Sequence, residues 1–183
     1  WGVEENVGKF IAWARLAVEQ EHPKAMYLLG YAQSVGRGVE KNRATAIVWY
    51  RRSAEAGYHR AQYHLAAAYN TGRGVPEDPA KFAQWARKAA DQKNIDGQFL
   101  LGFAYQRGRG VKKDAALSAL WYRRAAEQGH ARAQYRLALA NAKGRGVPVD
   151  RVEAYKWAKV AQLNKHRHAR ALVAELAAAM RSG

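Results

Sequence analysis

The tetrapeptide Gly-Arg-Gly-Val occurs four times in the chain, at 36–39, 72–75, 108–111 and 144–147, so that successive copies begin 36 residues apart. Tryptophan follows the same period. Five of the six tryptophans occupy one repeat position: Trp13, Trp49, Trp85, Trp121 and Trp157. Self-similarity at a fixed period means that one supersecondary unit is used repeatedly, and this constrains the fold more than any single residue does.

Each repeat predicts two helices joined by the glycine-rich tetrapeptide. Over residues 61–69, apolar side chains recur at i, i+4, i+7 and i+8, the spacing of one face of a helix. Gly72 is suited to end this helix because glycine adopts a positive φ without strain. Asp78 followed by Pro79 then favours an N-cap and the first turn of a second helix, whose apolar stripe includes Trp85.

Fixed small, apolar and capping residues mark the positions that pack or begin helices. The capping position is held by Asn6, Asn42, Asp78, Asp114 and Asp150. A helical hairpin of this length cannot bury its apolar stripe alone, so the hairpins must stack on one another. The sequence therefore predicts an all-α fold, an α-solenoid of stacked helix-turn-helix repeats, with the five periodic tryptophans in its core.

We expect a single domain over residues 1–183. It consists of a partial repeat over 1–24, full repeats over 25–60, 61–96, 97–132 and 133–168, and a C-terminal capping helix over 169–183. Residues 1–24 match only the loop and the second helix of a repeat, and no initiator methionine is present. We therefore expect the chain to be a piece of a longer protein, whose trimmed end at Trp1 offers a surface for self-association.

A family resemblance rests on the pattern Ala-x-x-x-Leu-(Gly/Ala)-x-Ala-Tyr-x-x-Gly-Arg-Gly-Val-x-x-Asp-x-x-x-Ala-x-x-Trp-Tyr-Arg-Arg-Ala-Ala-Glu-x-Gly, seen best in 97–129 and 33–61. This pattern resembles the Sel1-like repeat, a relative of the tetratricopeptide repeat, over almost the whole chain. The resemblance implies a right-handed superhelix whose concave side is lined by the first helix of each repeat. It further implies scaffolding, adaptor or regulatory binding in bacteria, and similar proteins include periplasmic assembly factors and immunity proteins against secreted toxins. The periplasm is therefore the favoured compartment and the cytoplasm the alternative.

The charge balance points to a negatively charged partner. The chain holds 31 basic and 15 acidic residues, giving a net charge of +16 and a pI near 10.3. Such a charge attracts anionic partners over long range but says nothing of the fold. The absence of cysteine excludes disulfides, thiolate zinc sites, iron–sulfur clusters and a cysteine nucleophile.

Residues that could support catalysis have structural roles or unsuitable spacing. The capping aspartates are needed at helix starts, and His22, His130 and His166 share a turn position. Four further acids follow basic residues by four positions and are expected to form ion pairs within helices: Glu19, Glu55, Asp91 and Glu127, after Arg15, Arg51, Arg87 and Arg123. No histidine pair has the i, i+4 spacing of a zinc motif, and no serine lies in a nucleophile elbow. We predict no catalytic residue, no metal site and no cofactor, and hence a protein that is not an enzyme.

Two periodic features have both a structural and a binding interpretation. The Gly-Arg-Gly-Val loops could bind phosphate through backbone N–H groups, but a loop that joins two helices four times is better explained as a turn. Their arginines, Arg37, Arg73, Arg109 and Arg145, either form a cationic series or are simply solvated. The tryptophans could stack on bases or sugars, but residues that stay fixed in every repeat are more typical of a core.

Positions that vary between repeats are the ones free to recognise a partner. On the first helix of each repeat they form a second stripe, apolar and aromatic toward the N-terminal side and basic toward the C-terminal side. The predicted partner-binding residues are Tyr31, His64, Leu100, Phe103, Arg107, Arg132, Arg136 and Lys143. Aromatic anchors next to arginines fit an acidic protein partner bound in the concave groove.

The leading hypothesis is a non-enzymatic protein-interaction module that binds this acidic partner as an adaptor, assembly scaffold or inhibitor, for example an immunity protein. The alternative is a polyanion binder, with nucleic acid, an acidic polysaccharide or an anionic membrane surface as its ligand. Its main support is the net charge of +16. The two hypotheses differ in their expected salt dependence, which is steep for a polyanion binder.

Overall fold

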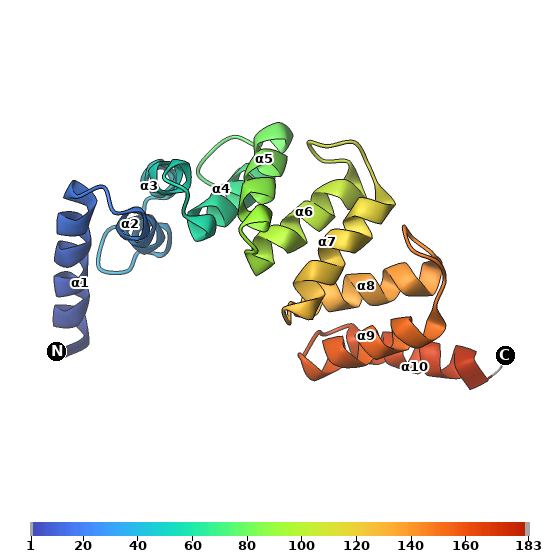
Figure 1. Cartoon of the computed structure of the whole chain (residues 1–183). Coiled ribbons are helices and arrows are strands. Elements are labelled where there is room, and N and C mark those ends of the chain that lie inside the picture. Colours follow the sequence, from blue (N-terminus) through green and yellow to red (C-terminus); the bar gives the residue numbers. More distant parts are fainter. Residues whose placement is uncertain (1, 182–183) are drawn as a thin grey trace. The chain divides into compact units, whose positions relative to one another are not determined.

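The computed structural model describes residues 2–181, with side chains described from residue 8 onward. Within residues 2–181 the chain forms ten α-helices and no strand (Figure 1). The helices are α1 (Gly2–Glu19), α2 (Pro23–Val35), α3 (Arg43–Glu55), α4 (His59–Thr71), α5 (Pro79–Asp91), α6 (Ile95–Arg107), α7 (Ala115–Glu127), α8 (Ala131–Lys143), α9 (Arg151–Leu163) and α10 (Ala169–Arg181). Even-numbered helices are the first helices of repeats and odd-numbered helices the second. The predicted all-α solenoid of helical hairpins is confirmed. Trp1, the predicted self-association end, lies outside the described residues.

The chain divides into two compact units, Trp1–Asn94 and Ile95–Gly183. The first unit contains α1 to α5 and the second contains α6 to α10. Within each unit, every helix packs against the next helix along the chain. None of the helices in the described part of the chain is long and apolar enough to cross a membrane.

Four helices begin, and three end, at the residues that the sequence predicts. The side chains of Asn42, Asp78, Asp114 and Asp150 each accept a hydrogen bond from the backbone N–H three residues later, at 2.8–3.0 Å. These N-caps are confirmed. At the other end, Gly36, Gly72 and Gly144 follow their helices in the left-handed conformation that favours glycine.

The prediction that Asn6 is a fifth N-cap is wrong. α1 runs without interruption from Gly2 to Glu19, so Asn6 lies inside the helix. The other four caps follow a Gly-Arg-Gly-Val loop that leaves a first helix, and the described residues contain no such helix before α1. Without it, the local hydrogen bonds of the helix continue through this position.

We expect the Asp114→Ala variant to lose about 1 kcal/mol of unfolding free energy, because the carboxylate of Asp114 satisfies the N–H of Leu117 at the start of α7. Urea denaturation followed by circular dichroism measures the loss. The matched control is Asp114→Asn, since Asn42 performs the same role in α3. A loss as large for asparagine as for alanine would contradict the capping explanation.

Three of the periodic tryptophans are buried, as predicted. Trp85, Trp121 and Trp157 are only 7–8% exposed. Trp49, on α3, is partly buried against α1 and α2, the two helices that precede α3. Trp13 is 71% exposed, so the core prediction is wrong for this residue. Its repeat position needs a preceding first helix to pack on, and none is present among the described residues.

Alternate repeats resemble one another more than neighbouring repeats do. Tyr50 and Tyr122 each pack against a glycine of the preceding helix, because a Cβ on Gly30 or Gly102 would lie 2.9 or 2.7 Å from the ring. The same two positions in the other repeats hold alanines: Ala66 with Ala86, and Ala138 with Ala158. The effective repeat is therefore a pair of hairpins, and each unit contains one tyrosine–glycine hairpin, α2–α3 or α6–α7.

Candidate functional site

The eight predicted partner-binding residues lie on four first helices. They are Tyr31 on α2, His64 on α4, Leu100, Phe103 and Arg107 on α6, and Arg132, Arg136 and Lys143 on α8. Tyr31, Arg107, Arg132 and Lys143 are exposed, whereas the other four are partly buried. The structure thus gives an aromatic set in the first unit and a predominantly basic set in the second.

Tyr31 and His64 belong to a cluster of aromatic rings in the first unit. The His64 ring stacks on Tyr50 with 5.0 Å between ring centroids and lies 5.5 Å from Tyr27. The ring centroid of Tyr31 lies 6.4 Å from the ring centroids of both Tyr27 and His64. Tyr27 and Tyr50 are buried, and sequence reasoning did not identify them as members of the cluster.

The two buried tyrosines of this cluster are neutral near pH 7. Burial raises the pKa of Tyr50 to about 12, and its hydroxyl donates to Ser34 Oγ at 3.2 Å. Burial also raises the pKa of Tyr27. The cluster therefore presents to a partner the half-exposed ring of Tyr31, supported by the neutral ring of Tyr27, as a suitable anchor for an apolar contact.

Arg107 and Arg136 come together in the second unit, where both line a cavity of about 630 Å³ formed by α6, α7, α8 and the adjoining loops. Tyr122 lines the same cavity, and its hydroxyl donates to Gln106 Oε1 at 2.9 Å. Burial raises the pKa of Tyr122 to about 12, while the charges of Arg136 and Arg107 act in the opposite direction. Both guanidinium groups therefore lie within electrostatic reach of the phenol.

The remaining predicted residues of the second unit lie outside this cavity. Arg132, at the start of α8, lies near His166, whose pKa is lowered by burial and further by neighbouring cations including Arg132. The His166 ring stacks on Tyr135 at 4.3 Å between centroids. In the described residues no carboxylate forms an ion pair with any of the four predicted cations of α6 and α8. These four cations, Arg107, Arg132, Arg136 and Lys143, form the basic stripe of the second unit, and no ion pair within the described part of the unit neutralises them.

Comparison with known proteins identifies the repeats. The family model for the Sel1 repeat matches residues 23–58, 59–94, 95–130 and 131–161. The chain belongs to the Sel1 repeat family. Sel1 repeat proteins are protein–protein interaction modules, and the family is in general a non-catalytic scaffold. A search of curated proteins found no match.

Solved structures with the same fold come from several bacteria. The crystal structure of c5321, a protective antigen present in uropathogenic Escherichia coli strains, is 33% identical, with a TM-score of 0.86 over 90% of this chain and 35% of its own. A Sel1 repeat protein from Oxalobacter formigenes is 32% identical, with a TM-score of 0.82 over 89% of this chain and 65% of its own. The immunity protein Pa5087 from Pseudomonas aeruginosa shares the fold at 24% identity and a TM-score of 0.55, over 88% of this chain and 60% of its own. The chain thus spans about a third of the length of the first of these proteins and 65% of the second.

Three of the periodic tryptophans of this Sel1 repeat protein have a cation from their own helix over the indole ring. Arg52 lies 5.2 Å from the ring centroid of Trp49. Lys88 lies 4.4 Å from the ring centroid of Trp85, and Arg124 lies 4.4 Å from that of Trp121. Each cation is three residues after its tryptophan. This contact occupies one face of the indole, and burial covers most of the rest in α5 and α7, so these rings are not open platforms for bases or sugars.

The basic series that includes Arg51 and Arg123 connects helices. Arg51 donates to the hydroxyl of Tyr69 on α4 at 3.1 Å, and Arg123 lies 3.8 Å from Glu153 Oε1 on α9. The predicted ion pairs of Arg51 with Glu55 and of Arg123 with Glu127 are therefore wrong. An exposed pair within a helix contributes only about 0.3–0.5 kcal/mol, so a better-packed partner on another helix is preferred.

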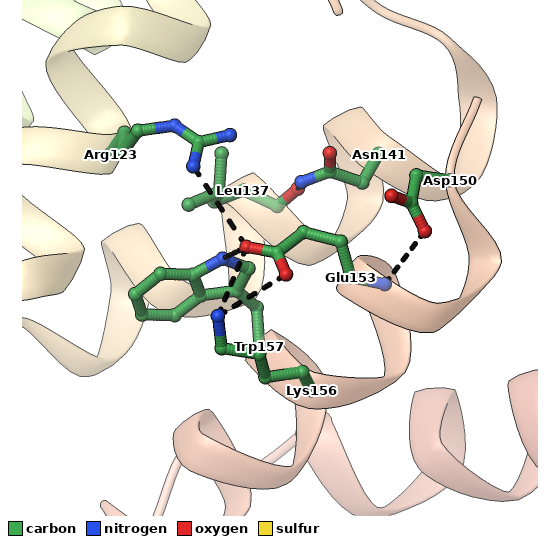
Figure 2. A network of polar contacts seen from close by, with 7 residues as sticks. All are labelled: Arg123, Leu137, Asn141, Asp150, Glu153, Lys156 and Trp157. Atoms are coloured by element: carbon green, nitrogen blue, oxygen red, sulfur yellow. Dashed lines mark hydrogen bonds and ion pairs between the residues drawn. The ribbon is translucent and has the colours of Figure 1, made fainter. Parts of the chain in front are cut away.

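Glu153 is the centre of a polar network that sequence reasoning missed (Figure 2). It accepts a hydrogen bond from Trp157 Nε1 at 2.7 Å and from Lys156 Nζ at 3.2 Å, and its backbone N–H donates to Asp150. The other repeats hold threonine, lysine and leucine at this position, so the network exists once. Because its oxygens are bound by side chains of α7 and α9, we interpret the network as structural. No group of three or more histidine, aspartate or glutamate side chains in the described chain is placed to hold a metal ion.

Proposed function

We propose that this Sel1 repeat protein binds an acidic protein partner through the exposed face of its first helices, as a non-enzymatic adaptor, assembly scaffold or inhibitor. The observation that carries the proposal is the basic stripe of the second unit. Arg107, Arg132, Arg136 and Lys143 lie on two successive first helices without a carboxylate partner in the described residues. Unneutralised arginines on a surface favour carboxylates, which they bind with two parallel hydrogen bonds.

The aromatic cluster of the first unit supplies the second kind of contact. Tyr31 is 40% exposed while its neighbours Tyr27 and His64 are buried and partly buried, so its ring is held in place before a partner arrives. Rigid aromatic side chains and arginines are enriched among the residues that dominate binding energy. The net charge of +16 increases the rate of encounter with an acidic protein.

An inhibitor of a secreted toxin is one concrete form of this function. The immunity protein Pa5087 has the same fold, and the family resemblance favours the bacterial periplasm as the compartment. The proposal does not depend on this form, because an adaptor or an assembly scaffold would use the same surface.

Charge reversal of the stripe tests the proposal. We expect Arg107→Glu/Arg136→Glu/Lys143→Glu to abolish binding of the acidic partner with helix content unchanged, because each substitution replaces attraction by repulsion. Wild-type and variant chains are used to capture protein from a lysate of the source organism, eluted with a salt gradient, and then titrated with the purified captured protein. The matched control reverses three cations outside the first helices, Lys112, Arg151 and Lys159.

A single acidic protein bound by the wild type and the control but lost from the stripe variant would support the proposal. Equal binding by the stripe variant would overturn it. Nucleic acid or polysaccharide that elutes early in the gradient, with no dependence on Tyr31, would instead favour the polyanion alternative, which the net charge alone supports.

A further inference from the structure

The cavity of the second unit has a counterpart in the first unit at the same repeat positions. The first-unit cavity, of about 340 Å³, is lined by Ser34, Tyr50, His64 and Arg73 among others. Residues 72 positions later, Gln106, Tyr122, Arg136 and Arg145, line the second-unit cavity of about 630 Å³. The cavity is thus a feature of the tyrosine–glycine hairpin and of the first helix that follows it.

The two cavities differ in charge. Arg107, Lys113, Arg136 and Arg145 all line the second-unit cavity, and no carboxylate does. The four cations come from the end of α6, the loop before α7, the middle of α8 and the loop after α8. Side chains from four separate segments of chain therefore converge on one space, which a merely solvated surface does not require.

The first-unit cavity contains fewer cations. Among its lining residues, Arg43 and Arg73 carry a permanent charge, and His64 replaces the arginine found at position 136. The His64 ring stacks on Tyr50 and so occupies part of the space. The second-unit cavity therefore has both more cations and a larger volume than the first-unit cavity.

We propose that the second-unit cavity is a binding site for a compact, multiply charged anion of the phosphate class, carried by a small molecule with at least two phosphate groups. This inference goes beyond the proposed protein interaction, because it assigns the cavity a ligand of its own. A single carboxylate would leave most of the four positive charges uncompensated. One phosphate group carries about −1.5 to −2 at neutral pH, so two of them match the cations of the cavity.

The donor set of the lining fits phosphate oxygens. Three guanidinium groups and one ammonium provide donors in several directions, as a tetrahedral group requires. Leu139 and Ala119 give the lining an apolar side. The hydroxyl groups of Tyr122 and Ser118 also line it, but they already donate to Gln106 Oε1 and to the carbonyl of Gly102, so the cations supply the donors. The volume of about 630 Å³ exceeds that of a diphosphate and lies in the usual range for small-molecule sites, so it accommodates an attached organic group.

Isothermal titration calorimetry with the whole chain tests this inference, with pyrophosphate, adenosine diphosphate and citrate as probes at physiological salt. We expect pyrophosphate to saturate at one site per chain and citrate, a tricarboxylate, to bind at least about ten-fold more weakly, because it lacks tetrahedral oxygen groups. Tighter binding of adenosine diphosphate would identify an organic diphosphate as the natural class. Equal affinity of the two phosphates would identify inorganic oligophosphate. Either result supports the site.

The variants Arg145→Gln and Lys113→Gln locate the binding. Each is expected to weaken pyrophosphate binding by about ten-fold or more without a change in thermal unfolding, since each removes one charged donor. The matched control is Arg73→Gln, the same substitution at the corresponding position of the first unit, with affinity unchanged within about two-fold. Lys113→Gln keeps the test valid if Arg145→Gln does not fold, because Lys113 is exposed and lies in a loop.

No measurable pyrophosphate binding, equal binding of citrate, or equal losses in the Arg73 and Arg145 variants would overturn the proposal. Arg145 and Lys113 lie outside the basic stripe of the first helices. Their substitutions therefore leave the test of the protein partner intact, and the two proposals can fail independently.

Discussion

Replacing Tyr122 by alanine is expected to lower the free energy of unfolding by about 3–5 kcal/mol, as for other large aromatic residues removed from a core. Tyr122 is 2% exposed and packs in a cluster with residues of α8, α9 and α10. Its loss leaves a cavity and removes the hydrogen bond to Gln106. Urea denaturation monitored by circular dichroism and tryptophan fluorescence measures the change.

The alternating pattern of the repeats supplies a second step for this experiment. Gly102→Ala alone is expected to cost about 1–3 kcal/mol, since the added Cβ would lie 2.7 Å from the Tyr122 ring. The double variant Gly102→Ala/Tyr122→Ala should lose less than the sum of the single variants by about 1 kcal/mol or more, because it recreates the alanine pair of the alternate repeats. Additive losses would contradict the view that glycine is present to admit the ring.

Much of the fold was predictable because its signals are local. The helix in 61–69 follows from apolar spacing within nine residues, and Asp78 with Pro79 marks the start of the next helix within two residues. The fixed period then transfers each local prediction to every repeat. The prediction failed at Trp13 and Asn6, where the same sequence signal lacks the preceding helix that gives it its role in the other repeats.

The candidate site was less predictable because it depends on which side chains meet. Variation between repeats identified Arg107 and Arg136 but could not show that they share a cavity with Tyr122, Lys113 and Arg145. The last two lie in loops, where helical periodicity gives no direction. The 72-residue alternation is visible in the sequence, yet its meaning depends on the contact between a glycine and a tyrosine of adjacent helices.

Three buried glutamines also make contacts that the sequence alone could not predict. Gln62, Gln98 and Gln134 are only 2–4% exposed, although glutamine is usually a surface residue. Gln62 and Gln134 each donate to a carbonyl of the preceding helix, on Ala54 and Ala126. Gln134 also accepts from Asn164, as Gln98 does from Gln128. Their spacing of 36 residues is a sequence signal for a structural role, but only the structure identifies the carbonyl groups that they satisfy.

Gly146→Ala is the second substitution with a large expected effect. Gly146 has φ +76°, and an added Cβ would overlap the backbone carbonyl of Ala115 at the start of α7. Two costs therefore add: the positive φ, of about 1 kcal/mol, and the displacement of the loop after α8 from α7, which raises the total to about 3 kcal/mol. Urea denaturation measures the loss, and the loop displacement is also expected to disturb the cavity that Gly146 and Arg145 line.

Gly129→Ala separates the two costs. Gly129 has φ +93° but no atom within 4 Å of an added Cβ, so its substitution carries the conformational cost alone. A loss at Gly146 that exceeds the loss at Gly129 by about 2 kcal/mol would assign the difference to the close approach of the loop and α7. Equal losses would mean that the second glycine of the tetrapeptide is needed only for its backbone conformation. In that case the recurrence of Gly-Arg-Gly-Val would reflect turn geometry, and contact between successive hairpins would not explain it.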